Sequence, residues 1–279
     1  MLIITNLTPS PTRNYHVFRP IKITACGVFF SSLSAHAFDV TYTSQAPVID
    51  GAQEAVWQQA SWHDMPYLMD GTLPEKADFT GRYRLLWDES YLYLQAEITD
   101  DVLIDTHADP LERYWDDDAL EIFVDGDASG GIHQFNHSAL AYHIGLDNQA
   151  ADIGDDEKAH LYNDHINSRW KRQLDAPNTI LWEVAIKRYP NDYTDAAPKA
   201  PIPLESGDVM GFMLAYCDND GSEVREHFMG SHDFAAQNGS KNLGFITADV
   251  FGKITLKNNA FSQHGVLKQS LMADMPPYD

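Results

Sequence analysis

The sequence has few cysteines, few basic residues and no long apolar run. Only two of its 279 residues are cysteine, and 19 lysines and arginines stand against 41 aspartates and glutamates. The formal net charge of −22 argues against nucleic acid and anionic membrane surfaces as partners, because both are bound through basic patches. No segment has the length and apolarity that a transmembrane helix needs. A neutral or cationic ligand, or a divalent cation, is compatible with this composition.

Common catalytic and cofactor signatures are absent as well. The sequence contains no HExxH zinc motif, CxxCH haem motif, GxSxG elbow, P-loop or dinucleotide fingerprint. The run Ser231-His232-Asp233 does not predict a catalytic triad, because triads assemble from distant segments. We therefore expect no nucleotide cofactor.

The N-terminus has the pattern of a signal peptide. Three basic residues precede the apolar run "ITACGVFFSSL", which ends in the small-x-small sequence Ala35-His36-Ala37. A basic region, a short apolar region and such a site predict cleavage after Ala37. We expect residues 1–37 to direct export and the rest of the chain to be extracytoplasmic, either periplasmic or secreted.

Export would leave Cys217 as the single cysteine, since Cys26 lies within the signal peptide. An internal disulfide would then be impossible even in an oxidising compartment. Cys217 lies in an apolar run and is expected to be a buried small hydrophobic residue rather than a nucleophile.

After Phe38 the pattern is that of short strands separated by turn residues. Alternating runs such as "RYRLLW", "YLYLQAEI", "ALEIFVD", "TILWEVAIK" and "DVMGFMLAYC" indicate half-buried strands. Further runs, "QFNHSALAYHI", "VREHFMG" and "LGFIT", extend the series, and "AQEAVWQQA" is long enough for one or two helical turns. We predict an all-β single domain, an antiparallel, jelly-roll-like β-sandwich over residues 38–257. Residues 258–279 read as a polar C-terminal tail.

The stretch "YWDDDALEIFVDGD", Tyr114 to Asp127, concentrates carboxylates beside a tryptophan. Period-two alternation places Leu120, Ile122 and Val124 on one face, which is the natural core face. Glu121 then lies on the opposite face, which is either a ligand groove or a face open to water. If it is a groove, Glu121 can bind a ligand hydroxyl, with Trp115 as a flat apolar platform.

Acidic turns offer candidate ligands for a hard cation. Asp100 and Asp101 end one expected strand, and Asp125 and Asp127 end another. Carboxylate oxygens suit calcium, although the spacing is not that of an EF-hand. A structural calcium ion and a plain acidic turn both remain open at this point.

Four stretches in this order resemble the family 9 carbohydrate-binding modules. They are "APVIDGAQEAVWQQA", "RLLWDESYLYLQAEITDDVL", "WDDDALEIFVDGD" and "NLGFIT", and the resemblance spans roughly residues 38–257. It implies a β-sandwich that binds sugars without cleaving them, between two tryptophans and polar side chains, with calcium ions in its loops. Such modules are usually appended to enzymes, so cooperation with separate glycoside hydrolases is implied here.

The resemblance also implies site residues. Trp115 matches the first tryptophan and Glu121 matches a glutamate that binds sugar hydroxyls. No tryptophan follows Trp182, so Phe234 becomes the candidate for the second aromatic contact. Asn136 stands where the family's pattern has an arginine.

Two other functional classes remain as alternatives. Related sandwiches carry b-type haem through methionine with histidine or lysine, and Met210, Met213, Met229, His227 and His232 supply such ligand types. A glycoside hydrolase component acting on xylan or glucan would need a pair of carboxylates, which no spacing in the chain selects.

Overall fold

The computed structural model describes residues 37–176 and 178–258. The expected signal peptide and C-terminal tail therefore lie outside the described residues, apart from residues 37 and 258. Strands make up nearly all of the regular structure in the described part, together with two short 3-10 helices, η1 (Ala55–Gln59) and η2 (Ala248–Val250). No helix in this part is long and apolar enough to cross a membrane.

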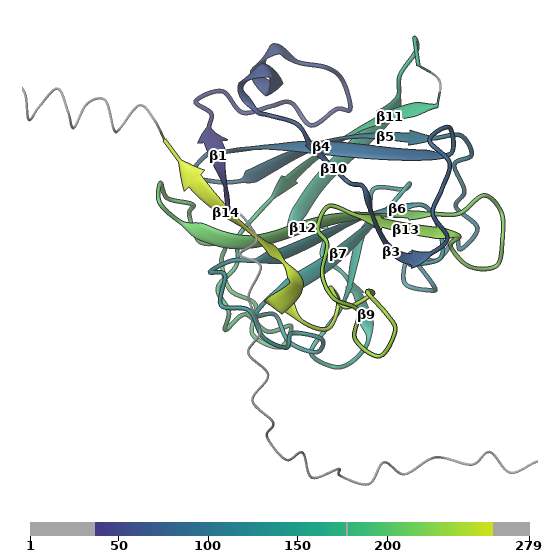
Figure 1. Ribbon diagram of the computed structural model, residues 1–279. Helices are drawn as coiled ribbons and strands as arrows, with labels where there is room; N and C mark the ends of the chain where they lie inside the picture. Colours follow the sequence, from purple (N-terminus) through teal and green to yellow (C-terminus); the bar gives the residue numbers. More distant parts are fainter. Residues whose placement is uncertain (1–36, 177, 259–279) are drawn as a thin grey trace, which may run out of the picture. The chain divides into compact units, whose positions relative to one another are not determined.

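The strands form two packed layers (Figure 1). The first layer contains β10 (Ile166–Arg172), β11 (Thr179–Ile186), β5 (Leu92–Asp100) and β4 (Phe79–Trp87), with β2 (His63–Asp64) at β4. The second contains β14 (Gly252–Lys257), β12 (Val209–Asp218), β6 (Ala119–Asp125), β7 (Leu140–Gly145), β8 (Ala150–Ile153) and β9 (Ala159–Leu161). Strand β13 (His227–Gly230) pairs with β12 and with β3 (Tyr67–Gly71). The predicted all-β sandwich is confirmed.

One strand departs from the antiparallel prediction. Strand β1 (Phe38–Tyr42) is parallel to both of its neighbours, β14 and β4. It thereby connects the two layers into one continuous path of hydrogen-bonded strands. The β4–β5 hairpin, in contrast, is antiparallel as expected, over the register Phe79–Asp100 to Trp87–Leu92.

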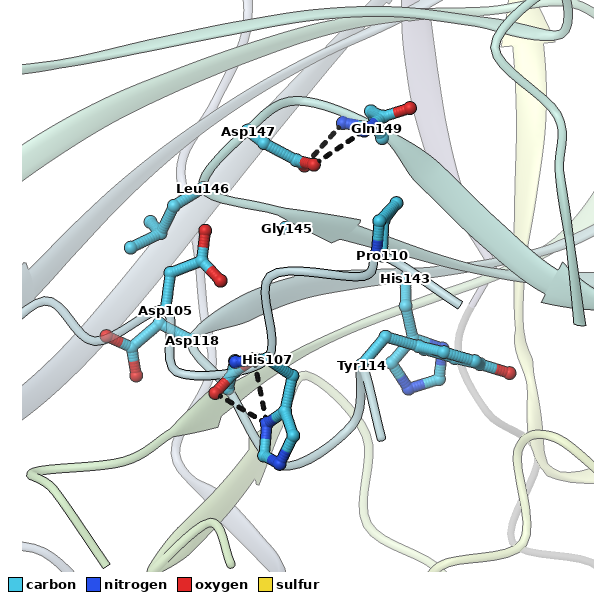
Figure 2. Close-up of a pocket in the computed structure, with 11 residues that line it drawn as sticks. Asp105, His107, Pro110, Tyr114, Asp118, His143, Gly145, Leu146, Asp147 and Gln149 are labelled. Carbon is cyan, nitrogen blue, oxygen red and sulfur yellow. Dashed lines mark hydrogen bonds and ion pairs between the residues drawn. The ribbon is translucent and has the colours of Figure 1, made fainter. Parts of the chain in front are cut away.

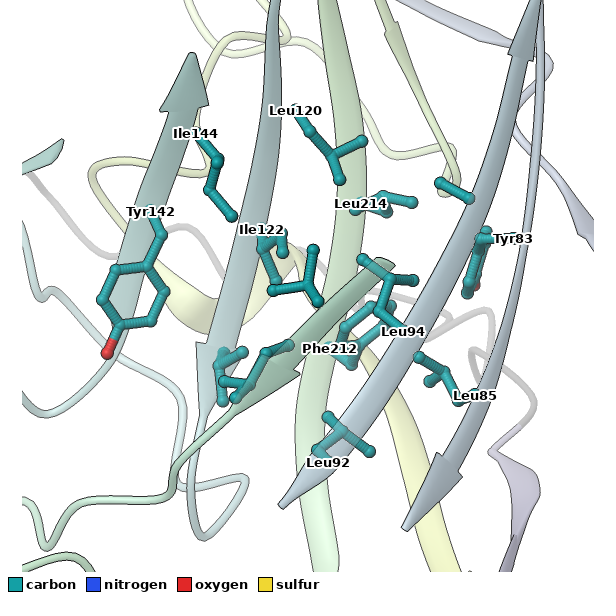
Figure 3. Packing of buried hydrophobic residues seen from close by; sticks show 14 of the residues in the cluster. Tyr83, Leu85, Leu92, Leu94, Leu120, Ile122, Tyr142, Ile144, Phe212 and Leu214 are labelled. Atoms are coloured by element: carbon teal, nitrogen blue, oxygen red, sulfur yellow. The ribbon is translucent and has the colours of Figure 1, made fainter. Parts of the chain in front are cut away.

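The main core lies between the layers and follows the period of two. The predicted core residues Leu120, Ile122 and Val124 of β6 all belong to it. Figure 3 shows Leu120 and Ile122 facing side chains of β4, β5 and β12, including Tyr83, Leu85, Leu94, Phe212 and Leu214. Burial of apolar area contributes about 25 cal/mol per Å². A slip of one residue would turn the apolar side chains of β6 away from this core, so their alternation is the main determinant of the strand register.

The opposite face of β6 is also covered. Ala119 and Phe123 belong to a second buried cluster, to which β12, β3, β13 and the segment around Phe251 contribute. Glu121 lies between them and is 1% exposed. The open-face interpretation of Glu121 is therefore wrong, and its carboxylate is enclosed by protein.

The expected strand "LGFIT" is a turn, and the expected strand "QFNHSALAYHI" is a turn in its first half and β7 in its second half. In "QFNHS" the Asn136 side chain accepts hydrogen bonds from the backbone N–H and the hydroxyl of Ser138, and β7 begins only at Leu140. In "LGFIT" the backbone N–H groups of Ile246 and Thr247 both bind the Leu243 carbonyl. Local bonds of these kinds compete with strand pairing.

A buried carboxylate attaches the segment before η1 to the first layer. Glu183 of β11 accepts hydrogen bonds from Trp57 Nε1 (2.8 Å) and Gln95 Nε2 (2.9 Å). Its second oxygen accepts from the backbone N–H groups of Asp50 and Gly51. One side chain thus fixes the "IDG" turn and the following tryptophan, which explains why these residues occur together in the sequence.

We predict that Glu183→Ala lowers the free energy of unfolding by roughly 3 kcal/mol or more, because each buried donor left without an acceptor costs about 1–3 kcal/mol. Urea denaturation measures this loss. Glu89→Ala is the matched control, since Glu89 accepts only an exposed hydrogen bond from Tyr42, and it should change the free energy by less than about 0.5 kcal/mol. Equal losses in the two variants would contradict the assignment.

Candidate functional site

The aspartates of "YWDDD" hold the loop that precedes β6. Asp117 accepts hydrogen bonds from the backbone N–H groups of Thr106 (3.0 Å) and His107 (2.9 Å). Asp118 accepts one from the backbone N–H of Ile104 at 2.5 Å. Partial burial by itself raises the pKa of Asp117, but the hydrogen bonds to its ionised carboxylate outweigh this effect and lower the pKa below its ordinary value. These carboxylates therefore fix the loop backbone.

The same loop presents Trp115 at the surface. Arg113 Nε lies 3.0 Å from a carboxylate oxygen of Asp116, and Arg225 donates to the Trp115 carbonyl. Trp115 is 42% exposed, and its ring meets Tyr114 edge to face at 5.1 Å. An indole held in this way is a preformed platform, because little conformational freedom is left to lose on binding.

Trp115 lies at a pocket of about 260 Å³. Trp115 and Phe245 are among its apolar lining residues, whereas Glu121, Arg225 and Asn242 contribute polar groups. An apolar pocket with a few converging polar groups is the usual form of a small-ligand site. The complete lining is Tyr114, Trp115, Glu121, His143, Asp152, Ile153, Arg225, Asn242 and Phe245.

Neighbouring strands supply the charged groups of this pocket. Glu121 of β6 is paired in register with His143 of β7, and His143 Nε2 lies 3.1 Å from Glu121 Oε2. Burial by itself lowers the pKa of His143, but the adjacent Glu121 carboxylate outweighs it and raises that pKa above its ordinary value. Arg225 lies beside them and donates to Cys217 Sγ at 3.2 Å, and Cys217 is buried as predicted.

The second carboxylate of the pocket is held by backbone groups. Asp152 accepts hydrogen bonds from the N–H groups of Ala141 (2.8 Å) and Ile153 (2.7 Å). Burial raises the pKa of Asp152 to about 6. Both of its oxygens are engaged in fixing β8 beside β7, so Asp152 and Glu121 do not form a free carboxylate pair.

A smaller cavity lies on the other side of Tyr114 and His143, which line both spaces. Figure 2 shows this cavity with Asp105, His107 and Asp147 around it. Its volume of about 20 Å³ has room for about one water molecule. The larger pocket is therefore the candidate ligand site.

The structure places only two of the four expected sugar-binding residues at this pocket. Trp115 and Glu121 line it. Phe234 packs instead against the second buried cluster, and Asn136 is bonded within its own turn. The cross-strand neighbour of Glu121 is His143 rather than Asn136.

Phe245 and Asn242 were missed, although both belong to the quoted "NLGFIT" stretch. A Cβ on Gly244 would lie 2.4 Å from Phe123 Cε1, so only glycine allows this segment to approach β6 so closely. His133 Nε2 donates to the Gly244 carbonyl at 2.7 Å. These contacts bring Phe245 to the pocket that Trp115 also lines. The glycine in the "NLGFIT" motif was the sequence signal that could have revealed this close approach.

The four candidate calcium ligands fall into separate groups. Asp100 lies with the buried Asp118 and Asp218, and Asp101 lies with Asp78 and Asp220; in each group the ligand atoms are within 4.8 Å of one another. Both oxygens of Asp218 are buried without a hydrogen-bond partner. Asp125, at the other end of β6, accepts from Gly130 N–H (2.7 Å) and Asp127 N–H (3.2 Å), so this pair has the geometry of a turn.

The residues considered for haem are distributed over separate parts of the fold. Met210 and Met229 fill the main core, whereas Met213 belongs to the second buried cluster. His227 Nε2 lies 3.1 Å from Asp78, and burial lowers the pKa of His232 to about 4. This distribution gives the haem alternative no support.

We predict that without metal ions three buried aspartates contribute a loss of stability as the pH rises from about 4 to about 9. Burial raises the pKa of Asp100 to about 6, of Asp218 to about 8 and of Asp118 to about 9, with mutual repulsion adding to the last two. In this window the folded state holds protons that the unfolded state releases, so a higher pH favours unfolding.

Thermal unfolding in a chelating buffer checks this pH dependence. Asp218→Asn should flatten it, because the amide carries no charge, while Asn in place of the exposed Asp233 should leave it unchanged. The same pH dependence in the parent protein and in Asp218→Asn between about pH 5 and 8 would be inconsistent with this interpretation of the buried aspartates.

Known proteins resemble this chain in sequence. A family model described as "Carbohydrate family 9 binding domain-like" matches residues 49–259. Endo-1,4-beta-xylanase A of Thermotoga maritima is 37% identical over 79 residues, which are 28% of this chain and 7% of that protein. Exoglucanase XynX of Acetivibrio thermocellus is 25% identical over 240 residues, 86% of this chain and 19% of that protein. The chain thus spans less than a fifth of the length of either relative.

Solved structures agree with the fold. A carbohydrate binding module family 9 from Caldicellulosiruptor kristjanssonii, in complex with cellotriose, has a TM-score of 0.58 at 21% identity and covers 80% of this chain and 94% of that one. A structure of such a module from the same organism with glucose has a TM-score of 0.57 at 20% identity, over 79% and 96% of the two chains. Since the family model spans more than half of the sequence and the fold agrees, this chain belongs to the family 9 carbohydrate-binding domains.

Proposed function

We propose that this chain is an exported, non-catalytic module that binds an oligosaccharide or polysaccharide in the pocket at Trp115. The observation that carries the proposal is the position of an exposed indole beside the enclosed carboxylate of Glu121 in one pocket. A sugar ring offers an apolar face of C–H groups and a rim of hydroxyls. The first matches an aromatic platform, and the second matches buried polar groups.

Phe245 takes the place of the second aromatic contact in this proposal. It lines the pocket with Trp115, and Asn242 from the same segment adds an amide that can donate to and accept from hydroxyls. Arg225 adds further donors and is held by Cys217 and the Trp115 carbonyl. The pocket therefore contains the rings of Trp115 and Phe245 together with both hydrogen-bond donors and hydrogen-bond acceptors.

The proposed biological role is assistance in the use of polysaccharide by separate glycoside hydrolases. The relatives in sequence are a xylanase and an exoglucanase of which this chain covers only a small part. A structural neighbour contains cellotriose. Xylo-oligosaccharides and cello-oligosaccharides are therefore the first ligands to test.

The carboxylates of the pocket do not favour catalysis. Asp152 is occupied by two backbone N–H groups, and Glu121 faces a histidine on the next strand. A glycosidase needs one carboxylic acid and one free carboxylate on opposite sides of the scissile bond. Release of reducing sugar from xylan or glucan that disappears in Glu121→Gln would overturn the non-catalytic assignment.

We expect Trp115→Ala to weaken sugar binding by about 1–3 kcal/mol, or roughly 5–150-fold, because it removes a stacking surface. Phe245→Ala should also weaken binding, whereas Phe234→Ala should leave it unchanged. Isothermal titration with xylo- and cello-oligosaccharides measures all three, and the variants should unfold at similar temperatures.

The two phenylalanines are a matched pair because each is partly buried and only Phe245 lines the pocket. A loss of affinity in Phe234→Ala but not in Phe245→Ala would place the second aromatic contact elsewhere. Wild-type affinity in Trp115→Ala would remove the basis of the whole proposal.

The proposal includes a structural calcium ion at the buried aspartates. Asp218 has two oxygens without a hydrogen-bond partner, and Asp100 and Asp118 lie within ligand range of it. Oxygen ligands with several negative charges suit Ca²⁺. Such an ion would offset the mutual repulsion that raises the pKa values of Asp118 and Asp218.

We predict that calcium at 100 times its Kd adds about 2.7 kcal/mol to the free energy of unfolding, with a larger effect at pH 8 than at pH 5. Denaturation with and without calcium measures the effect. Asp218→Asn should abolish it and Asp127→Asn should retain it. Stabilisation that is lost only in Asp127→Asn would move the ion to the other end of β6.

A further inference from the structure

Three different metal-ligating side chains converge beneath the pocket. Glu121 of β6, His143 of β7 and Cys217 of β12 lie on adjacent strands, and their ligand atoms are all within 4.8 Å of one another. All three residues are buried, with exposures of 1%, 8% and 0%. A carboxylate, an imidazole and a thiol on neighbouring positions of one sheet face form an ordered set rather than a flexible surface cluster.

Two polar atoms of this group have no hydrogen-bond partner in the described part of the chain. Glu121 Oε2 and His143 Nδ1 are buried and have no hydrogen-bond partner among the described residues. Glu121 Oε2 and His143 Nε2 lie 3.1 Å apart, within ion-pair range but without the geometry of a hydrogen bond. Buried polar groups are rarely left in this state, because each costs about 1–3 kcal/mol.

We propose that Glu121, His143 and Cys217 bind a zinc ion, with the fourth coordination position open to the pocket. Sulfur, nitrogen and a carboxylate oxygen are the ligand types that Zn²⁺ takes together. A hard cation such as Ca²⁺ prefers all-oxygen sites, of which the Asp100–Asp118–Asp218 group is the example in this chain.

Charge balance supports this assignment. A thiolate and a carboxylate together neutralise the charge of Zn²⁺, and the imidazole binds in its neutral form. The Arg225 N–H donates to Cys217 Sγ at 3.2 Å, and such outer hydrogen bonds orient a thiolate ligand. The guanidinium itself lies 3.7 Å from the Asp70 carboxylate, so its own charge has a partner outside the three proposed ligands.

The zinc site goes beyond the proposed sugar binding and does not depend on it. The zinc ion and the sugar would both contact Glu121. This is compatible, because one carboxylate oxygen can bind a metal ion while the other accepts a hydrogen bond from a hydroxyl. The direct test therefore reads metal binding alone. Sugar affinity is measured separately in a buffer that contains calcium and no zinc, so that failure of either proposal can be told from failure of the other.

The experiment uses the full chain carrying Cys26→Ser, which leaves Cys217 as the single thiol. The protein is freed of metal by a chelator and titrated with Co²⁺, whose complexes with thiolate show a sulfur-to-metal charge-transfer absorption. We expect one equivalent of Co²⁺ to produce this band and equimolar Zn²⁺ to abolish it. Circular dichroism of each variant confirms that it is folded.

Cys217→Ser should abolish the charge-transfer band. Removal of an outer-shell partner typically weakens metal binding by roughly 10–100-fold, and loss of the thiolate ligand itself should weaken Zn²⁺ binding by more than that. His143→Gln and Glu121→Gln should weaken Zn²⁺ binding while retaining the thiol, which keeps the test valid if the serine variant fails to fold. His137→Gln is the matched control, because His137 lies with Asp155 and Asp195 in another possible metal-binding group.

Two results would overturn the proposal. One is Co²⁺ binding without the charge-transfer band in the parent protein. The other is Zn²⁺ affinity that is unchanged in Cys217→Ser, His143→Gln and Glu121→Gln but lost in His137→Gln, which would assign the ion to the group at Asp195.

Discussion

The burial of strand β6 on both faces is the constraint on which the candidate site depends. One face of β6 fills the core between the two layers, and the other lies under a second apolar cluster. A glutamate in the middle of such a strand cannot be solvated by bulk water, and an isolated buried charge is costly. Glu121 therefore requires a cationic or hydrogen-bonding partner, and His143, directly across the strand pair, is the nearest. The pocket is the place where this buried charge remains accessible to a ligand.

Carboxylates hold several loops of the described part of this chain, a task that disulfides perform in many other proteins. Cys217 is buried as a free thiol, so loops must be held by other means. Asp117 and Asp118 bind backbone N–H groups of the loop before β6, and Glu183 binds those of the "IDG" turn. An ionised carboxylate accepts several hydrogen bonds, each stronger than a neutral one. The acidic composition is thus partly a consequence of how the loops are fixed.

The sequence allowed the sandwich, the core face of β6 and the positions of Trp115 and Glu121 to be predicted, because each follows from local alternation or an ordered motif. The partners of these residues could not be predicted. His143 replaced Asn136 beside Glu121 because the register of β7 is set by tertiary pairing, whereas Asn136 is held by its own turn. Phe245 replaced Phe234 because the approach of Gly244 to Phe123 decides which ring reaches the pocket. The calcium candidates were separated for a similar reason, since Asp100 lies with Asp118 just before β6, whereas Asp125 is at the end of β6.

Asp118 connects the acidic group to the pocket. It belongs to the loop that carries Trp115, where it accepts from Ile104 N–H, and it also accepts from Asn219 N–H at 2.8 Å. The same side chain lies within ligand range of Asp100 and Asp218. In the absence of a cation, the raised pKa of Asp118 favours its protonated form, which weakens these hydrogen bonds. If calcium occupies the group as proposed above, Asp118 would stay ionised at neutral pH and keep its strongest hydrogen bonds to the loop that carries Trp115. Under that proposal, cation binding and ordering of this loop would strengthen each other by the same factor.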